Sequence, residues 1–377
     1  MKVIVIGAGA WGLPAALHLS IRGHDVTLID RDVPGGPTSS SRGASRLWRL
    51  ADPSPRRMPV MRAAVEAMDR LGELVGAALY TRNTLMWRDG GSLDATAAVM
   101  RDLRVPFHRI AARHVAQSFP HLAPDTRDAL LVGDAGVVLA GVLLQRTVAA
   151  LEQRGVKLKM RTTLLGVSTE GGRASVQTDK GTLVADHVVI AAGPGSRAIL
   201  AGLGVDLPLR TYLEQTVRFD HGGALDAAPC LFDGPIGDRA GLYAMPDPAG
   251  GYKLGWDAPL RETDGDDPDR SVDPSRTAHI ERAAAALFPE VELRTLDAAV
   301  CCWTDSPDGE FVIDRVDDRV TVACGDSGEG FKYAALIGEH LADLVEERER
   351  PERSRLWGME RFSGIGFAER HPTAMGR

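Results

Sequence analysis

The chain has 377 residues, 44% of them hydrophobic and 25% charged, so it can bury a sizeable core in one to three domains. Its 44 Lys and Arg against 51 Asp and Glu give a formal net charge of -7, which argues against a general nucleic-acid binder. The four cysteines form neither a disulfide framework nor a zinc pattern, and no apolar run approaches about 20 residues. We therefore expect a cytoplasmic protein with no metal and no membrane span.

The first 32 residues predict a βαβ unit. A β-branched run at 3–6 leads into GAGAWG, then an apolar helical pattern as far as Leu19 and a second strand pattern at 26–29. The apolar start MKVIVIG runs into these glycines instead of a signal-peptide cleavage site, so we do not expect secretion. A strand, a glycine-rich turn and a helix in this order are typical of a Rossmann-like nucleotide domain.

The turn of this unit carries a dinucleotide fingerprint. Gly7, Gly9 and Gly12 have the G-x-G-x-x-G spacing, and Asp30 follows Gly12 by 18 residues. Gly7 allows the tight turn, Gly9 lets backbone N–H groups approach a pyrophosphate, and Gly12 permits close packing of helix on strand. Asp30 would accept a hydrogen bond from a ribose hydroxyl.

The rest of the chain favours FAD over a nicotinamide cofactor. Residues 33–56 form a Gly/Pro/Ser/Arg loop instead of a further βα unit, and the loop is too long to lack a role. The nucleotide-domain pattern resumes in separated segments, namely a helix at 142–154, strands near 156–160 and 173–178, a strand-turn-helix at 187–200 and another at 320–347. A nucleotide domain built from separated segments suits a flavoprotein.

The intervening segments predict a second sheet. The alternating runs TYLEQTVRFD and GGYKLGWDA indicate a mostly antiparallel sheet that covers the flavin, and 261–276 is typical of a solvated polar loop. The predicted fold class is α/β, with an FAD-binding Rossmann-like domain of discontinuous segments and a mostly antiparallel substrate domain. The FAD-binding domain comprises 1–82, 139–210 and 299–377, and the substrate domain 83–138 and 211–298.

Five motifs beyond the fingerprint occur in an informative order. They are SSSRGASRLWR at 39–49, GLYAMP at 241–246, YKLGW at 252–256, CCWTDSPDGEFVID at 301–314 and GDSGEGFK at 325–332. With them the chain resembles, nearly end to end, the monomeric sarcosine oxidase and N-methyltryptophan oxidase family of D-amino-acid oxidase-like flavoproteins. The resemblance implies FAD, a small amine or amino-acid substrate, oxygen as the acceptor, and a monomer.

Two cysteines stand side by side in the fourth motif. From the residues alone, Cys301 and Cys302 are best read as small buried hydrophobes. Neighbouring side chains of a strand point to opposite faces, so only one of the two can face a flavin. The resemblance implies that Cys301 forms a thioether with the 8-methyl carbon of FAD.

Four cations are candidates for the reaction site. Arg46 and Arg49 would share a face if their loop closes into a helical turn, although the residues alone favour solvated arginines that bind phosphate or nothing. The resemblance implies that Arg49 and Lys332 hold a substrate carboxylate and that Arg46 lies close to the flavin ring. It assigns Lys253 to oxygen activation and Tyr243 to the substrate side.

The same motifs supply further candidate contacts, and some depart from the family. The resemblance adds Ser41, Arg42, Gly328, Gly330 and Lys332 to the residues that bind the flavin. Three histidines of sarcosine oxidases are replaced here, by Arg42, Asp257 and Glu329, and Trp303 replaces a tyrosine. These changes alter the charge and proton chemistry of the pocket, so Asp257 and Trp303 join the candidate catalytic residues and sarcosine itself is not expected.

The predicted function is FAD-dependent oxidation of the C–N bond of an amino acid or N-methyl amino acid, giving an imine and hydrogen peroxide. Trp48, Trp256 and Trp303 lie in site-forming motifs, which favours an aromatic or cyclic substrate larger than sarcosine. Two alternatives stay open: a dehydrogenase that uses another electron acceptor, and a flavin-binding scaffold that no longer turns over.

Overall fold

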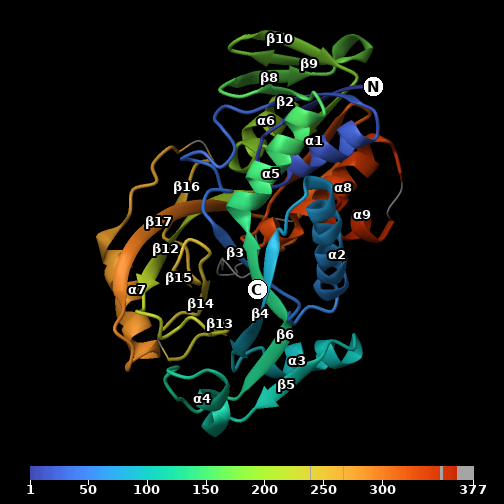
Figure 1. The fold of residues 1–377 in the computed structure, drawn as a ribbon. Coiled ribbons are helices and arrows are strands. Elements are labelled where there is room, and N and C mark those ends of the chain that lie inside the picture. The colour runs from blue at the N-terminus through green and yellow to red at the C-terminus, as the bar shows by residue number, and fades with distance from the viewer. Residues whose placement is uncertain (238, 266, 349–350, 363–377) are drawn as a thin grey trace.

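Two sheets organise the protein, as the computed structural model shows (Figure 1). The structure describes residues 1–237, 239–265, 267–348 and 351–362. The two large sheets have six and ten strands, and a smaller three-stranded sheet packs beside the six-stranded one. The predicted α/β fold class, with discontinuous segments in the nucleotide domain and a second, mostly antiparallel sheet, is confirmed.

The six-stranded sheet is built from segments far apart in the chain. Its order is β18 (Val312–Asp317), β19 (Val320–Cys324), β11 (His187–Ile190), β1 (Lys2–Ile6), β2 (Asp25–Ile29) and β7 (Lys157–Lys159). All neighbouring pairs are parallel except β18 with β19. Parallel strands are covered on both faces, which explains why β1, β11 and β19 are almost entirely buried and mostly apolar.

Alternation along β1 assigns a different layer to each face of this sheet. Val3 and Val5 pack with one apolar cluster, which includes the helices α1 (Gly12–Ile21), α2 (Arg57–Val75), α5 (Ala140–Gln153) and α8 (Ala334–Val345). Ile4 and Ile6 pack with another, formed by α6 (Ser196–Gly202) and the small sheet of β8 (Leu164–Ser168), β9 (Ala174–Thr178) and β10 (Gly181–Ala185). The six-stranded sheet is therefore covered on both faces.

The ten-stranded sheet is mostly antiparallel. Its path is β16 (Arg261–Thr263), β12 (Arg210–Asp220), β15 (Tyr252–Trp256), β14 (Leu242–Pro246), β13 (Cys230–Asp233), β4 (Tyr80–Arg88), β6 (Ala129–Leu139) and β3 (Ser45–Arg49). In addition, β17 (Arg294–Asp305) pairs with β12, and β5 (Phe107–Ile110) pairs with β6. The outer face of β12 and β15 packs on α7 (Pro274–Leu287), which leaves the other face open to a cavity.

The remaining described helices lie at the edges. They are α3 (Leu93–Asp102), α4 (Val115–Ser118) and α9 (Pro351–Trp357), with short 3-10 turns such as η4 (Gly330–Tyr333). None of the helices in the described ranges has the length and apolarity needed to cross a bilayer.

Two local predictions were wrong. The loop predicted over 33–56 contains the strand β3, because its sequence SRLWR pairs with β6 far along the chain. Opposite Trp48 stands Gly136 with φ +157°, where a Cβ would crowd the indole nitrogen. Arg46 and Arg49 therefore lie on a strand and not on a helical turn. Similarly, 261–276 is not all loop, since it contains β16 and the start of α7.

The proposed domain boundaries do not coincide with sheet membership. The strand β3 belongs to the range 1–82 yet pairs in the ten-stranded sheet, and the boundary between 298 and 299 falls inside β17. Residues 363–377 of the last FAD-binding segment lie outside the described residues. The domain division stays a prediction.

Candidate functional site

A cavity of about 1020 Å³ joins the two sheets. At one end it is lined by Gly9 and Asp30, which follow the carboxyl ends of the parallel strands β1 and β2. At the other end it is lined by Lys253, Cys301 and Lys332, beside the inner face of the ten-stranded sheet. Ligands of open α/β sheets bind at such carboxyl ends, so this cavity is the candidate site.

The fingerprint residues form a backbone cradle at the first end. Gly7 has φ +105°, and a Cβ there would overlap the carbonyl of Ala191. A Cβ on Gly12 would overlap the carbonyl of Gly7, so only glycine allows α1 to begin this close to β1. The carboxylate of Asp30 accepts hydrogen bonds from Ala8 N–H at 2.6 Å and from Asp32 N–H at 2.8 Å. The arrangement matches what a ribose and a pyrophosphate require.

The loop before β3 closes over this cradle. The Ser41 hydroxyl accepts a hydrogen bond from Ala10 N–H at 2.9 Å, which fastens the loop to the fingerprint. Arg42 also lines the cavity and is exposed. The guanidinium of Arg46 donates to the carbonyls of Ser40 (2.9 Å) and Arg42 (2.7 Å) and lies 5.2 Å from the centre of the Phe331 ring. These hydrogen bonds to the loop hold the Arg46 side chain at the cavity wall.

Lys253 is positioned by Ser45 of β3 and by Asp247, which directly follows β14. Its ammonium donates to the Ser45 carbonyl at 2.8 Å and the Ser45 hydroxyl at 2.5 Å, and that hydroxyl donates to Asp247 at 2.5 Å. Burial and the charge of Arg46 lower the pKa of Lys253 to about 8, although Asp247 opposes the shift. Lys253 is therefore a cation of reduced pKa in the cavity.

Strand alternation turns the two adjacent cysteines to opposite faces of β17, as predicted, although both line the cavity. On β17, Cys301 lies opposite Glu214 of β12, whereas Cys302 packs with Leu213 and Val300 and has its sulfur 3.0 Å from the Ser40 hydroxyl. Burial raises the pKa of the Cys301 thiol to about 11. Cys301 shares the inner face with Glu214, so it can face a ring bound in the cavity.

Sequence reasoning missed Glu214. Its side chain lines the cavity, is only 2% exposed, and neither carboxylate oxygen has a hydrogen-bond partner among the described residues. Burial raises the pKa of Glu214 well above its usual range, and Asp257 adds to the shift while Arg276 opposes it. The alternation Tyr212, Glu214, Thr216, Arg218 in TYLEQTVRFD was the available signal, because it puts a carboxylate on a buried face.

Tyr243 and Trp303 complete the inner wall. The ring of Tyr243 lies over Gly255, where a Cβ would overlap it, so the glycine of YKLGW makes room for the tyrosine. Burial, with Glu214 second, raises the pKa of Tyr243 well above its usual range, and its hydroxyl is neutral. The ring centres of Trp303 and Tyr212 are 5.6 Å apart, and the indole N–H of Trp303 has no hydrogen-bond partner within the described part of the chain.

The GDSGEGFK turn closes the wall of the cavity next to β3. Trp11 of the fingerprint donates from its indole nitrogen to the carbonyl of Gly330 at 2.9 Å, and Gly328 has φ +73°. Asp326 of this turn also lines the cavity, and sequence reasoning missed it. Burial raises the pKa of Asp326 to about 7, although backbone N–H groups of Gly328 and Thr304 oppose the shift. A carboxyl group that titrates near neutrality is a candidate for proton transfer.

Arg49 and Lys332 do converge, but on a carboxylate of the chain itself. Arg49 is 1% exposed and pairs with Asp52 and with Glu329, each at 3.1 Å. Lys332 pairs with the other oxygen of Glu329. Burial and the charge of Arg49 lower the pKa of Lys332 well below its usual range. Arg49 is not among the described residues that line the cavity, whereas Glu329 and Lys332 are.

Three other predicted positions lie away from the cavity. Asp257 is buried just beyond the end of β15, where its N–H donates to the Gly241 carbonyl at 2.7 Å. The Trp48 indole donates to Thr81, and Trp256 packs near His279. None of the three is among the described cavity-lining residues. Of the three tryptophans used to infer an aromatic or cyclic substrate, only Trp303 supports that inference.

The residues present fit a dinucleotide with a redox ring. A glycine cradle lies at one end. At the other end, the buried carboxylate of Glu214 and indole N–H of Trp303 have no hydrogen-bond partner among the described residues, so a bound ligand can supply one. Within the described ranges, no group of three His, Cys, Asp or Glu side chains is arranged to hold a metal ion. Residues of both sheets line the cavity, so one ligand can contact both sheets.

Comparisons with known proteins agree with this geometry. The family described as FAD dependent oxidoreductase matches residues 2–344. Monomeric sarcosine oxidase of Streptomyces avermitilis is 27% identical over 364 residues, covering 91% of this chain and 93% of that protein. N-methyl-L-tryptophan oxidase of Yersinia pestis is 23% identical over 372 residues, covering 96% and 99%. The structure of L-proline dehydrogenase from P. horikoshii has a TM-score of 0.85 at 20% identity, covering 97% of this chain and 99% of that one, which shows likeness of fold.

Proposed function

Because the chain belongs to the family of FAD dependent oxidoreductases, we propose that it oxidises the C–N bond of an amino acid or N-methyl amino acid to an imine, with oxygen reduced to hydrogen peroxide. The resemblance found from the motifs is confirmed at the level of the family, and the chain is an FAD-dependent amine or amino-acid oxidoreductase. The substrate is proposed to be larger than sarcosine, the acceptor to be oxygen, and the protein to be a cytoplasmic monomer that binds neither nucleic acid nor membranes.

One observation carries the proposal. A single cavity has the dinucleotide cradle of Gly9 and Asp30 at one end and the cation Lys253 beside Cys301 and Tyr243 at the other. When bound, FAD supplies the acceptor for the hydride that leaves the carbon next to nitrogen. The chain supplies orientation, partial exclusion of water and charge, since these residues are half-buried.

The residues at the ring end have separate proposed tasks. Lys253 carries a positive charge at neutral pH, so it can stabilise negative charge that develops on oxygen. Tyr243 keeps its proton and can donate a hydrogen bond to the substrate. Arg49 and Lys332 together can pair with a substrate carboxylate, and Arg46 and Ser41 hold the loop against the cofactor. Cys301, which shares a face with Glu214, is the proposed site of the covalent tether.

Anaerobic mixing tests the proposal. The yellow protein should lose its flavin absorbance with a panel of amino acids and N-methyl amino acids, and air should restore the colour and release peroxide. A flavin that bleaches but recovers only with an added artificial acceptor would identify the dehydrogenase alternative. A flavin that dithionite reduces but no amine of the panel bleaches would identify the scaffold alternative.

A further inference from the structure

The carboxylate of Glu329 stands where two cations converge. One oxygen is 3.1 Å from the guanidinium of Arg49, and the other contacts the ammonium of Lys332. The three side chains are 1%, 7% and 8% exposed for Arg49, Glu329 and Lys332, so water screens these charges little. This is the pairing that Arg49 and Lys332 would make with the carboxylate of an amino-acid substrate.

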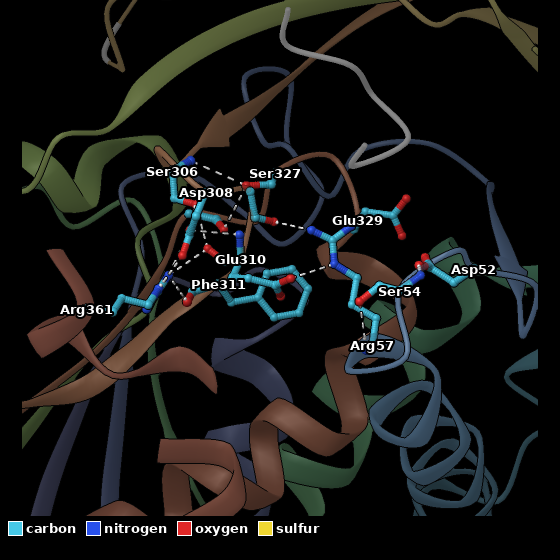
Figure 2. Close-up of polar contacts among 12 residues, drawn as sticks. Asp52, Ser54, Arg57, Ser306, Asp308, Glu310, Phe311, Ser327, Glu329 and Arg361 are labelled. Atoms are coloured by element: carbon cyan, nitrogen blue, oxygen red, sulfur yellow. Dashed lines mark hydrogen bonds and ion pairs between the residues drawn. The ribbon is translucent and has the colours of Figure 1, made fainter. Parts of the chain in front are cut away.

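The surrounding charges leave no cation in excess in this described network. Arg49 also pairs with Asp52 at 3.1 Å, and the neighbouring Arg57 pairs with Glu310 at 2.8 Å. Figure 2 shows Asp52, Arg57 and Glu329 lying together, with Glu310 on the far side of Arg57. Arg57 and Glu310 thus form a balanced pair of their own. Arg49 and Lys332 already face two carboxylates, so a further carboxylate would enter their subsite uncompensated.

We propose that Glu329 is an internal carboxylate that fills the substrate-carboxylate subsite of Arg49 and Lys332 and must be displaced or neutralised before an amino-acid substrate binds there. The inference rests on the proposed function and makes Glu329 a specificity-determining residue. Two like charges cannot share one buried cation pair at low cost, so a small carboxylate alone is a weak ligand. A substrate must then gain affinity from contacts elsewhere in the cavity, which disfavours amino acids as small as sarcosine.

The position of Glu329 allows the exchange. Its side chain lines the cavity, so a ligand can reach it, and rotation of that side chain toward the cavity frees both Arg49 and Lys332. Asp52 stays behind to balance Arg49 when Glu329 leaves. Removing the charge of Glu329 should therefore open the subsite and leave one of the two cations, Lys332, without its described carboxylate.

Titration of the holoenzyme with benzoate and with its neutral analogue benzamide tests the proposal, with the flavin absorbance spectrum as the readout. Glu329→Gln should bind benzoate at least tenfold more tightly than the wild type, about 1.4 kcal/mol, with benzamide changed less than threefold. Glu310→Gln is the matched control, because it removes a carboxylate paired with Arg57 that does not line this cavity. It should leave both affinities within threefold.

Several results would overturn the proposal. They are equal benzoate affinity in wild type and Glu329→Gln, equal tightening by Glu310→Gln, and a wild type that already binds benzoate a hundredfold more tightly than benzamide. The last comparison needs no variant, so the proposal stays testable if Glu329→Gln does not fold. Benzoate binding needs no turnover either, which separates this test from the amine-bleaching test of the proposed function.

A matched pair of substrates extends the test to catalysis. Proline and pyrrolidine differ only by the carboxylate. For each compound, anaerobic mixing gives the rate of flavin reduction divided by the half-saturating concentration. The value for proline relative to that for pyrrolidine should rise at least tenfold in Glu329→Gln. Glu329→His, which carries the residue type of similar oxidases, should move the ratio in the same direction. A ratio unchanged in both variants would show that Glu329 does not compete with the carboxylate.

Discussion

The two ends of the cavity are built by different means. The nucleotide end is made of backbone, with glycines where a Cβ would collide and one carboxylate held by two N–H groups. The ring end is made of buried and half-buried side-chain charges contributed by β3, β15 and the GDSGEGFK turn. The difference teaches that a nucleotide cradle depends on where side chains are missing, whereas the ring end depends on how charges are paired.

The largest expected effect breaks the nucleotide end. Gly12→Val should abolish flavin binding, because the new side chain would overlap the Gly7 carbonyl and push α1 away from the turn. The flavin content of purified protein, read from its absorbance, measures the loss. Gly133→Ala is the control, since a Cβ there meets open space, and it should keep full flavin content. Normal flavin content in Gly12→Val would contradict a backbone cradle.

At the ring end, removal of one buried cation should cost stability. Arg49→Met leaves Asp52 and Glu329 buried with less compensation, and we expect a loss of about 3–5 kcal/mol in unfolding free energy. Urea unfolding measures it, and the double variant with Glu329→Gln should recover part of the loss. Arg109→Met removes a pair whose arginine is 46% exposed and should cost at most about 1 kcal/mol. Equal losses in the two single variants would contradict the account.

The next effect concerns oxygen. Lys253→Met should slow reoxidation of the reduced protein by about 100-fold, as for loss of one transition-state donor, and slow its reduction by substrate far less. Because the pKa of Lys253 is lowered to about 8, the cation is lost as pH rises through that value, so the wild-type reoxidation rate should fall there. Stopped-flow traces separate the two half-reactions, and equal slowing of both would reassign Lys253 to binding.

The smallest effect concerns Glu214. Burial raises its folded pKa, so its contribution to stability is present below the unfolded pKa and is lost as pH rises toward the folded value. Glu214→Gln removes that loss. At pH 8 its free energy of unfolding should exceed that of the wild type by about 1–3 kcal/mol, and at pH 5 the difference should be smaller. Urea unfolding at both pH values measures the gap. A gap that does not change with pH would show that Glu214 finds a partner on folding.

The sequence predicted the nucleotide end well because its signals are local. The fingerprint and the first βαβ unit depend on residues close in the chain, as does, at the ring end, the strand alternation that separates Cys301 from Cys302. The motifs also named Lys253 and Lys332, which line the cavity. Their catalytic and binding roles stay predictions, as do those of Tyr243 and Trp303.

What the sequence could not give is non-local pairing. Arg46 and Arg49 lie on a strand and not on the helical turn that their spacing would allow, because β3 pairs with β6, about 90 positions away. The bond between Arg49 and Glu329 spans 280 positions, and no local pattern signals it. Glu214 was visible as a charge on an alternating strand, but only the fold shows that this face is buried.

The central claim is that one FAD spans the cavity from Asp30 to Cys301. Peptide mapping by mass spectrometry after acid denaturation and proteolysis tests it most directly, since it reports which cysteine carries the flavin. The account predicts FAD attached to the peptide of β17 at Cys301, with Cys302 unmodified and Cys301→Ser releasing all flavin on denaturation. Flavin recovered wholly free from the wild type, or attached at Cys302, would contradict the proposed placement of the ring beside Cys301.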